Sequence, residues 1–133
     1  METKFNSQIC TTREQSERLL ALGLKKETAD MNYTRLSRAD SWTLFIGKPL
    51  GYEDIPTEYL IPAWSLHRLI EMMPRFVEWE CGAWFYMSHD DVLYTDLDCV
   101  TKDFSRRSGI YYNVISAIEW LIKEGDFNKE YLV

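Results

Sequence analysis

The chain has 133 residues, the size of one domain, so we expect a single α+β domain over residues 1–133, with residues 1–10 as a tail or edge segment. Its 15 Lys and Arg against 21 Asp and Glu give a formal net charge of −6, which repels phosphate and excludes nucleic acid as the main partner. With 46% apolar and 27% charged residues, the composition also excludes an intrinsically disordered chain.

The first ordered element is predicted from Thr11 onward. Thr11 and Glu14 have the spacing of a capping box, which predicts a helix after them. Gly23 can take the left-handed conformation that ends a helix. Residues 26–31 are long enough for one or two further turns, so the sequence predicts an N-terminal helical corner.

Residues 32–60 carry one strand-like run, Trp42–Ile46, which ends at Gly47. The stretch 47–62 is predicted to be a loop, and it is long for a compact domain. It contains no glycine-rich string that could hold a phosphate, so nucleotide binding through this loop has no support.

Pro62 is suited to the first turn of a helix, and Pro74 stops one, so the sequence predicts a helix over 62–73. Its apolar residues follow helical spacing and form one core-facing stripe: Leu66, Leu69, Ile70 and Met73.

The middle of the chain predicts an antiparallel meander. Strand alternation places Trp84 and Tyr86 on one face, with Phe85 and Met87 on the other. The three β-rich runs, separated by Cys81-Gly82 and by His89-Asp90-Asp91, are Phe76–Glu80, Ala83–Ser88 and Val92–Asp98.

The clearest predicted helix runs from about Ile110 to Glu124, and Gly125 can cap its end. Its broad apolar stripe implies packing across a sheet. Phe127, Tyr131 and Leu132 should bring the last eight residues back onto the body, since large apolar groups in a free tail would stay in water.

Together these elements predict an α+β fold. We expect an antiparallel sheet of three to four strands, packed on one face by the helices over 62–73 and 110–124, with the N-terminal helical corner alongside.

Nothing in the sequence indicates a membrane or secretory protein. The first ten residues lack an apolar stretch of signal-peptide length, and no apolar run approaches the length of a membrane span, so we expect a cytoplasmic protein without membrane contact. Cys10, Cys81 and Cys99 are odd in number and lack CxxC spacing, which favours free thiols over zinc or disulfides. The adjacent basic pairs Lys25-Lys26 and Arg106-Arg107 lie close to acidic residues.

One pair of side chains permits a metal hypothesis. His67 and Glu71 are four residues apart and would share a helix face, from which both could reach one ion. A third ligand would have to come from His89, Asp90 or Asp91. Two ligands make no site, so we predict no metal and no cofactor, and keep a small metal-assisted hydrolase as an alternative. No nucleophile motif supports catalysis.

The aromatic content favours a different function. Five Trp, eight Tyr and six Phe are more than one small core easily encloses, so some rings should lie at the surface, where such rings commonly contact partners. We therefore expect a non-catalytic protein that binds a protein partner, or a second copy of itself, through exposed aromatics. Core packing alone and a small-ligand cleft under the 47–62 loop remain the alternatives. The candidate binding residues are Trp64, Trp84 and Tyr86, with His67 and Glu71.

Three strings carry a resemblance: Thr12–Leu19 continuing through Ala21–Gly23 to Thr28–Met31, then Ile61–Leu66, and Ala117–Ile122. They resemble a group of small uncharacterised proteins of gut-bacterial genomes, often encoded in prophages or other mobile elements. The resemblance covers both ends and the centre of the chain. It implies an accessory factor of a mobile element, and it implies no activity, cofactor or catalytic residue.

Overall fold

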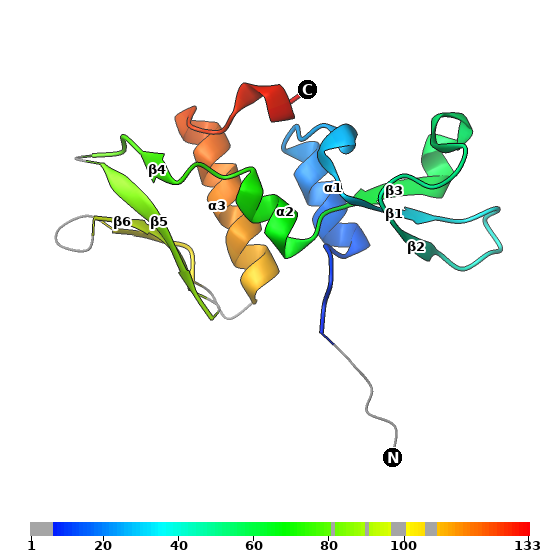
Figure 1. Ribbon diagram of the computed structural model, residues 1–133, viewed down its shortest axis with the longest axis horizontal. Helices are drawn as coiled ribbons and strands as arrows, with labels where there is room; N and C mark the ends of the chain where they lie inside the picture. Colours follow the sequence, from blue (N-terminus) through cyan, green and yellow to red (C-terminus); the bar gives the residue numbers. More distant parts are fainter. Residues whose placement is uncertain (1–6, 81, 90, 97–100, 106–108) are drawn as a thin grey trace, which may run out of the picture.

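In the computed structural model, which describes residues 7–80, 82–89, 91–96, 101–105 and 109–133, three α-helices form a layer between two antiparallel sheets (Figure 1). The helices are α1 (Arg13–Ala21), α2 (Leu66–Glu71) and α3 (Ile110–Glu124). One sheet has the order β2-β1-β3, with β1 (Met31–Thr34), β2 (Thr43–Ile46) and β3 (Leu60–Ala63). The other has the order β4-β5-β6-β7, with β4 (Phe76–Val77), β5 (Ala83–Ser88), β6 (Asp91–Thr95) and β7 (Thr101–Asp103). The predicted α+β class is confirmed, and the three-stranded sheet is an addition to it.

Helix α1 starts one residue later than predicted. Thr12 Oγ1 accepts a hydrogen bond from Gln15 N at 3.2 Å, and Gln15 Oε1 accepts one from Thr12 N at 2.9 Å, so these two residues make the capping box. The box expected at Thr11 and Glu14 is wrong. Thr11 is buried instead, and its hydroxyl pairs with Ser16 Oγ at 2.8 Å.

The end of α1 is as predicted. Gly23 has a φ of +105°, and Leu24 N donates back to Leu19 O at 3.2 Å. The corner that follows is smaller than expected, since it consists of one 3₁₀ turn, η1 (Lys26–Thr28). The prediction of helical turns over 26–31 is therefore wrong after Thr28, and Met31 already belongs to β1.

The three-stranded sheet explains the position of Pro62. This residue pairs with Asn32 of β1 inside the edge strand β3, and the helix predicted to start at Pro62 begins only after Ser65. An edge strand tolerates proline because one of its sides needs no hydrogen-bond donors. Ser65 then caps α2, where its hydroxyl oxygen accepts from Arg68 N at 3.1 Å. The connection from β2 to β3 contains two 3₁₀ turns, η2 (Tyr52–Asp54) and η3 (Thr57–Tyr59).

Helix α3 has the predicted bounds, ends at Gly125 with a φ of +80°, and packs on the inner face of the four-stranded sheet. Tyr94 of β6 is fully buried there, with its ring centroid 5.8 Å from that of Trp120. The buried stripe of the helix comprises Val114, Ile115, Ile118 and Leu121. No helix in the described part of the chain is both long and apolar enough to cross a bilayer.

The last eight residues pack against the body, as predicted. Phe127 is buried, and Lys25 N donates to Tyr131 O at 2.8 Å just before the chain ends. Leu132, which follows the 3₁₀ turn η4 (Lys129–Tyr131), forms an antiparallel bridge with Leu24. The C-terminal segment thereby closes over the end of α1.

An ion pair connects α1 to α3. Arg18 Nη2 lies 2.7 Å from Glu119 Oε2, and this hydrogen bond, opposed by desolvation, lowers the pKa of Glu119. Both side chains are about one third exposed, so we expect Arg18→Gln to lower the free energy of unfolding by about 1 kcal/mol or less at neutral pH.

The pH dependence of this pair gives the test. Because the pKa of Glu119 is lower in the folded chain, the pair stabilises the fold above the ordinary glutamate pKa of about 4.3, and this stabilisation is lost as the pH falls through the lowered pKa. Urea unfolding of wild type and Arg18→Gln, followed from neutral to acidic pH, should give stabilities that converge in acid. A difference that stays constant over the whole range would contradict the assignment.

Candidate functional site: an aromatic sheet face

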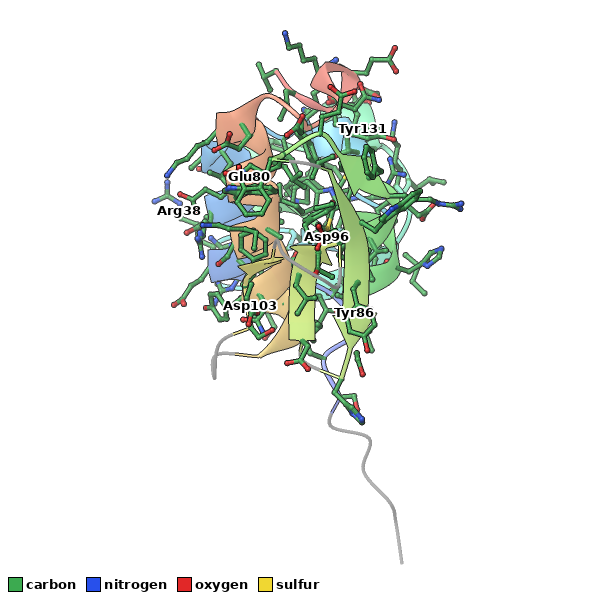
Figure 2. All side chains as sticks on the ribbon, turned by 90° about the vertical axis from the view of Figure 1, so that its left-hand side faces the viewer. Arg38, Glu80, Tyr86, Asp96, Asp103 and Tyr131 are labelled. Atoms are coloured by element: carbon green, nitrogen blue, oxygen red, sulfur yellow. The ribbon has the colours of Figure 1, made fainter. Side chains whose placement is uncertain are left out.

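The outer face of the four-stranded sheet presents three large rings. Phe76 of β4 pairs with Trp84 of β5, and Tyr86 follows two residues later on the same strand, so all three point to the side opposite α3. Their residue surfaces are 43%, 60% and 48% exposed. We call Phe76, Trp84 and Tyr86 the aromatic platform. Figure 2 looks onto this side of the molecule, with Tyr86 labelled.

Helix α3 packs against the opposite face of these strands and therefore leaves the platform uncovered. Phe85, between Trp84 and Tyr86 in the sequence, points inward, where its ring centroid lies 5.5 Å from that of Tyr94. Alternation along β5 therefore sends one set of rings into the core and the other into solvent. The predicted exposure of Trp84 and Tyr86 is confirmed.

Gly82 positions the first ring of the platform. A Cβ at this residue would lie 2.7 Å from Phe76 Cζ, so the missing side chain lets the phenyl ring lie against the backbone of its neighbour. Phe76 then meets Trp84 with ring centroids 5.0 Å apart and planes tilted by 57°. Phe76 was absent from the predicted site, although its pairing with Trp84 across the predicted meander could have suggested it.

We expect Gly82→Ala to displace Phe76 and to destabilise the sheet. Gly51→Ala is the matched control, because Gly51 also has a positive φ, of +74°, but nothing within 4 Å of its added Cβ. Backbone strain should cost about 1–2 kcal/mol in each variant, and the collision with Phe76 should add about 1–3 kcal/mol only in Gly82→Ala. Chemical denaturation measures both values; equal losses in the two variants would show that the ring contact is unimportant.

Carboxylates surround the platform. Asp91 and Asp103 lie at outward-facing positions of β6 and β7, since they pair in register with Ser88 and Leu93. Glu78 and Glu80 are exposed in the connection between β4 and β5. The described strand positions of this outer face carry no Lys or Arg. Figure 2 shows Glu80, Asp103 and Tyr86 on the side that faces the viewer.

The prediction that Trp64 contributes to a binding surface is wrong. Trp64 is 0% exposed, and its Nε1 donates to Thr28 Oγ1 at 3.0 Å. Its backbone N donates to Thr11 Oγ1 at 3.1 Å. The residue joins β3 to α2 inside the core, because both its ring and its peptide group find partners there.

His67 and Glu71 are brought together as predicted, with His67 Nε2 3.5 Å from Glu71 Oε1 on the exposed side of α2. The metal hypothesis needed a third ligand. The described residues contain no group of three or more His, Cys, Asp and Glu side chains that could hold an ion, and Asp90 lies outside the described residues. A binding role of His67 and Glu71 stays a prediction.

Of the three cysteines, Cys10 lies in the described part of the chain. Cys10 is buried and free, its Sγ lies 3.2 Å from the Tyr33 hydroxyl, and burial raises its pKa. Such a thiol is a poor nucleophile at neutral pH. Cys81 and Cys99, predicted to be free as well, lie outside the described residues.

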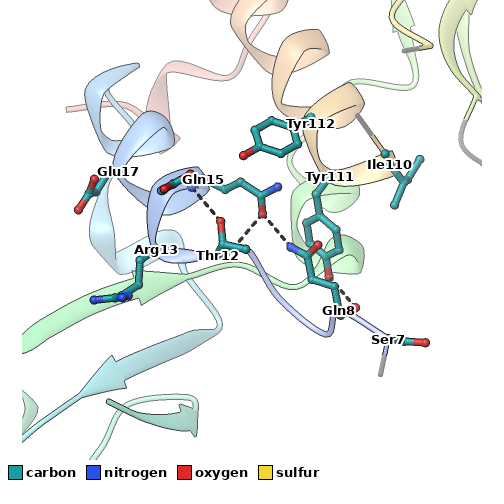
Figure 3. Close-up of a pocket in the computed structure, with 11 residues that line it drawn as sticks. Ser7, Gln8, Thr12, Arg13, Gln15, Glu17, Ile110, Tyr111 and Tyr112 are labelled. Carbon is teal, nitrogen blue, oxygen red and sulfur yellow. Dashed lines mark hydrogen bonds between the residues drawn. The ribbon is translucent and has the colours of Figure 1, made fainter. Parts of the chain in front are cut away.

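Several cavities lie away from the platform, including one between two helices and one beside a loop. The first, of about 860 Å³, opens between the first turns of α1 and α3 (Figure 3). Two of its polar side chains bind each other, since Gln8 Nε2 donates to Gln15 Oε1 at 2.7 Å. The second, of about 600 Å³, lies beside the 47–62 segment that the sequence predicted to cover a cleft. Its apolar lining is Leu36, Phe45, Pro49, Leu50 and Ile55.

Comparisons of the chain with protein-family models, curated proteins and solved structures found no match. The geometry of the chain itself is therefore the basis for a function.

Proposed function

We propose that this protein is a non-catalytic interaction protein that binds a protein partner through the aromatic platform. The observation that carries the proposal is the adjacency of Phe76, Trp84 and Tyr86 on a sheet face that no helix of the described residues covers. Contiguous exposed apolar surface of this kind is typical of contact sites, and Trp and Tyr contribute large contact area there at a small loss of conformational entropy.

The setting of the proposed interaction comes from the resemblance alone. We place the protein as an accessory factor of a prophage or other mobile element, acting in the cytoplasm. Neither statement affects the platform, and the binding experiment does not depend on them.

Affinity capture from the native host tests the proposal. Tagged wild type is compared with Trp84→Ser and with Ile46→Ser, a control that removes a more exposed apolar side chain, 84% against 60% for Trp84, from the other sheet. We expect a protein that wild type and Ile46→Ser retain and Trp84→Ser loses. Retention by all three proteins, or by none, would contradict the proposal. Sedimentation of the purified proteins shows whether the retained partner is a second copy.

The cavity beside the 47–62 segment supports a second candidate, the binding of a small apolar ligand. Leu36 and Leu50 are 91% and 102% exposed, although both line this cavity of about 600 Å³, a volume within the range of small-molecule sites. Titration with an apolar fluorescent probe, compared between wild type and Leu50→Asp, tests it. Binding that Leu50→Asp leaves unchanged would remove this candidate.

A further inference from the structure

We propose that the partner segment seated on the aromatic platform is an extended, basic stretch of polypeptide with Arg or Lys at alternate positions. This inference rests on the proposed function and names the chemistry of its partner. Three separate observations carry it: the charge of the outer face, the rings that lack a cation, and the spacing of Trp84 and Tyr86.

The charge of the outer face is negative. Asp91 flanks the platform on the neighbouring strand, and the exposed Glu78 and Glu80 lie in the loop beside it. A basic segment is attracted to such a face, whereas an acidic one is repelled. The net charge of −6 over the whole chain acts in the same direction at longer range.

Several rings of this protein have a cation over them, and in the described part of the chain the rings of the platform do not. The Arg35 guanidinium lies 4.4 Å from the Trp42 ring centroid, Lys48 Nζ lies 4.9 Å from that of Tyr52, and the Arg68 guanidinium 5.7 Å from that of Tyr131. Within the described residues, no Lys or Arg lies over Phe76, Trp84 or Tyr86. The exposed faces of Trp84 and Tyr86 are therefore open to cations from another chain.

The spacing of the two rings suits an extended chain. Trp84 and Tyr86 are two residues apart on β5, so their Cα atoms are about 7 Å apart along the strand. Side chains at positions i and i+2 of an extended peptide have the same separation. Two basic side chains of one such segment can thus reach both rings, while the residue between them points away.

Calorimetric titration with synthetic peptides of about eight residues tests the inference. One peptide alternates Arg with Thr, a second Gln with Thr, and a third Glu with Thr. We expect the Arg peptide to bind wild type and Ile46→Ser equally, and to lose about tenfold or more in affinity on Trp84→Ser. Asp91→Asn should weaken it severalfold, and added salt should weaken it further. Neither the Gln nor the Glu peptide should bind comparably.

The outcomes separate this inference from the function on which it rests. Equal binding of the Gln peptide, or an affinity for the Arg peptide that Trp84→Ser leaves unchanged, overturns the basic segment. The same holds if no peptide binds. In each of these cases, a protein captured from the native host by wild type but not by Trp84→Ser would still support the protein-binding platform. Failure to capture such a protein would overturn the proposed function itself.

Discussion

Trp64→Ala is expected to lower the free energy of unfolding by about 3–5 kcal/mol. Trp64 has no exposed surface, so the truncation leaves a cavity in the core. It also removes the N–H donor from which Thr28 Oγ1 accepts at 3.0 Å. A loss of this size is a large share of the stability of an ordinary domain, about 5–15 kcal/mol. Urea unfolding followed by circular dichroism measures it.

A milder variant and a matched control keep this test interpretable. Trp64→Phe retains most of the ring volume but removes the donor from which Thr28 Oγ1 accepts, while the Thr28 hydroxyl still donates to Lys25 O. It should therefore cost less than Trp64→Ala and still about 1 kcal/mol. Trp84→Ala removes a ring that is 60% exposed but contacts Phe76, so it should cost about 0.5–1.5 kcal/mol, well below Trp64→Ala. If Trp84→Ala destabilised the protein as much as Trp64→Ala, the assignment of one indole to the core and the other to the surface would be wrong.

Ile118→Ala is expected to cost about 2–5 kcal/mol. Ile118 is 0% exposed in the middle of α3, the helix that packs on the inner face of the four-stranded sheet. Removing its side chain takes contacts away from the layer that holds the sheet in place. The thermal or urea midpoint should fall accordingly, and the sheet should become more accessible to hydrogen exchange.

Ile46→Ala is the control for this variant, since the same substitution is made at a residue that is 84% exposed in β2. It should change stability by about 0.5 kcal/mol or less. Comparable losses at Ile118 and Ile46 would contradict the placement of α3 as the central buried helix.

The sequence predicted best those elements whose signals are local. Helix α3 combines a long apolar stripe with Gly125 at its end, and Gly23 ends α1 by the same left-handed geometry. These features depend on residues within a few positions of one another, so periodicity and capping rules suffice. The strand pattern of β5 was local in the same sense and gave Trp84 and Tyr86 a common face.

The elements that were missed depend on distant partners. β1 is only four residues long and buries the polar Asn32, so its own pattern does not identify it, and it forms because β2 and β3 pair with it on both sides. Pro62 satisfies the rules for a first helical turn, yet it lies in β3, because its pairing with Asn32 of β1 makes this segment an edge strand. The choice between Thr11 and Thr12 as the helix cap was likewise settled by contacts of Thr11 with Ser16 and Trp64.

The candidate site was predicted only in part, because it also depends on residues that are distant in the sequence. Residue type indicated that some rings must be exposed, but it could not say which, because Trp64 and Trp84 differ only in what surrounds them. Strand register then adds Phe76 to the platform and α3 covers the opposite face, and both facts require the assembled sheet.

The most direct measurement of the central claim is the indole N–H region of an amide correlation spectrum during titration with the Arg–Thr peptide. The five tryptophans give five indole signals, and Trp84→Phe and Trp64→Phe assign two of them. We expect the Trp84 signal to shift as peptide is added and the Trp64 signal to stay in place. A Trp84 signal that does not move while signals elsewhere do would contradict the platform as the contact surface.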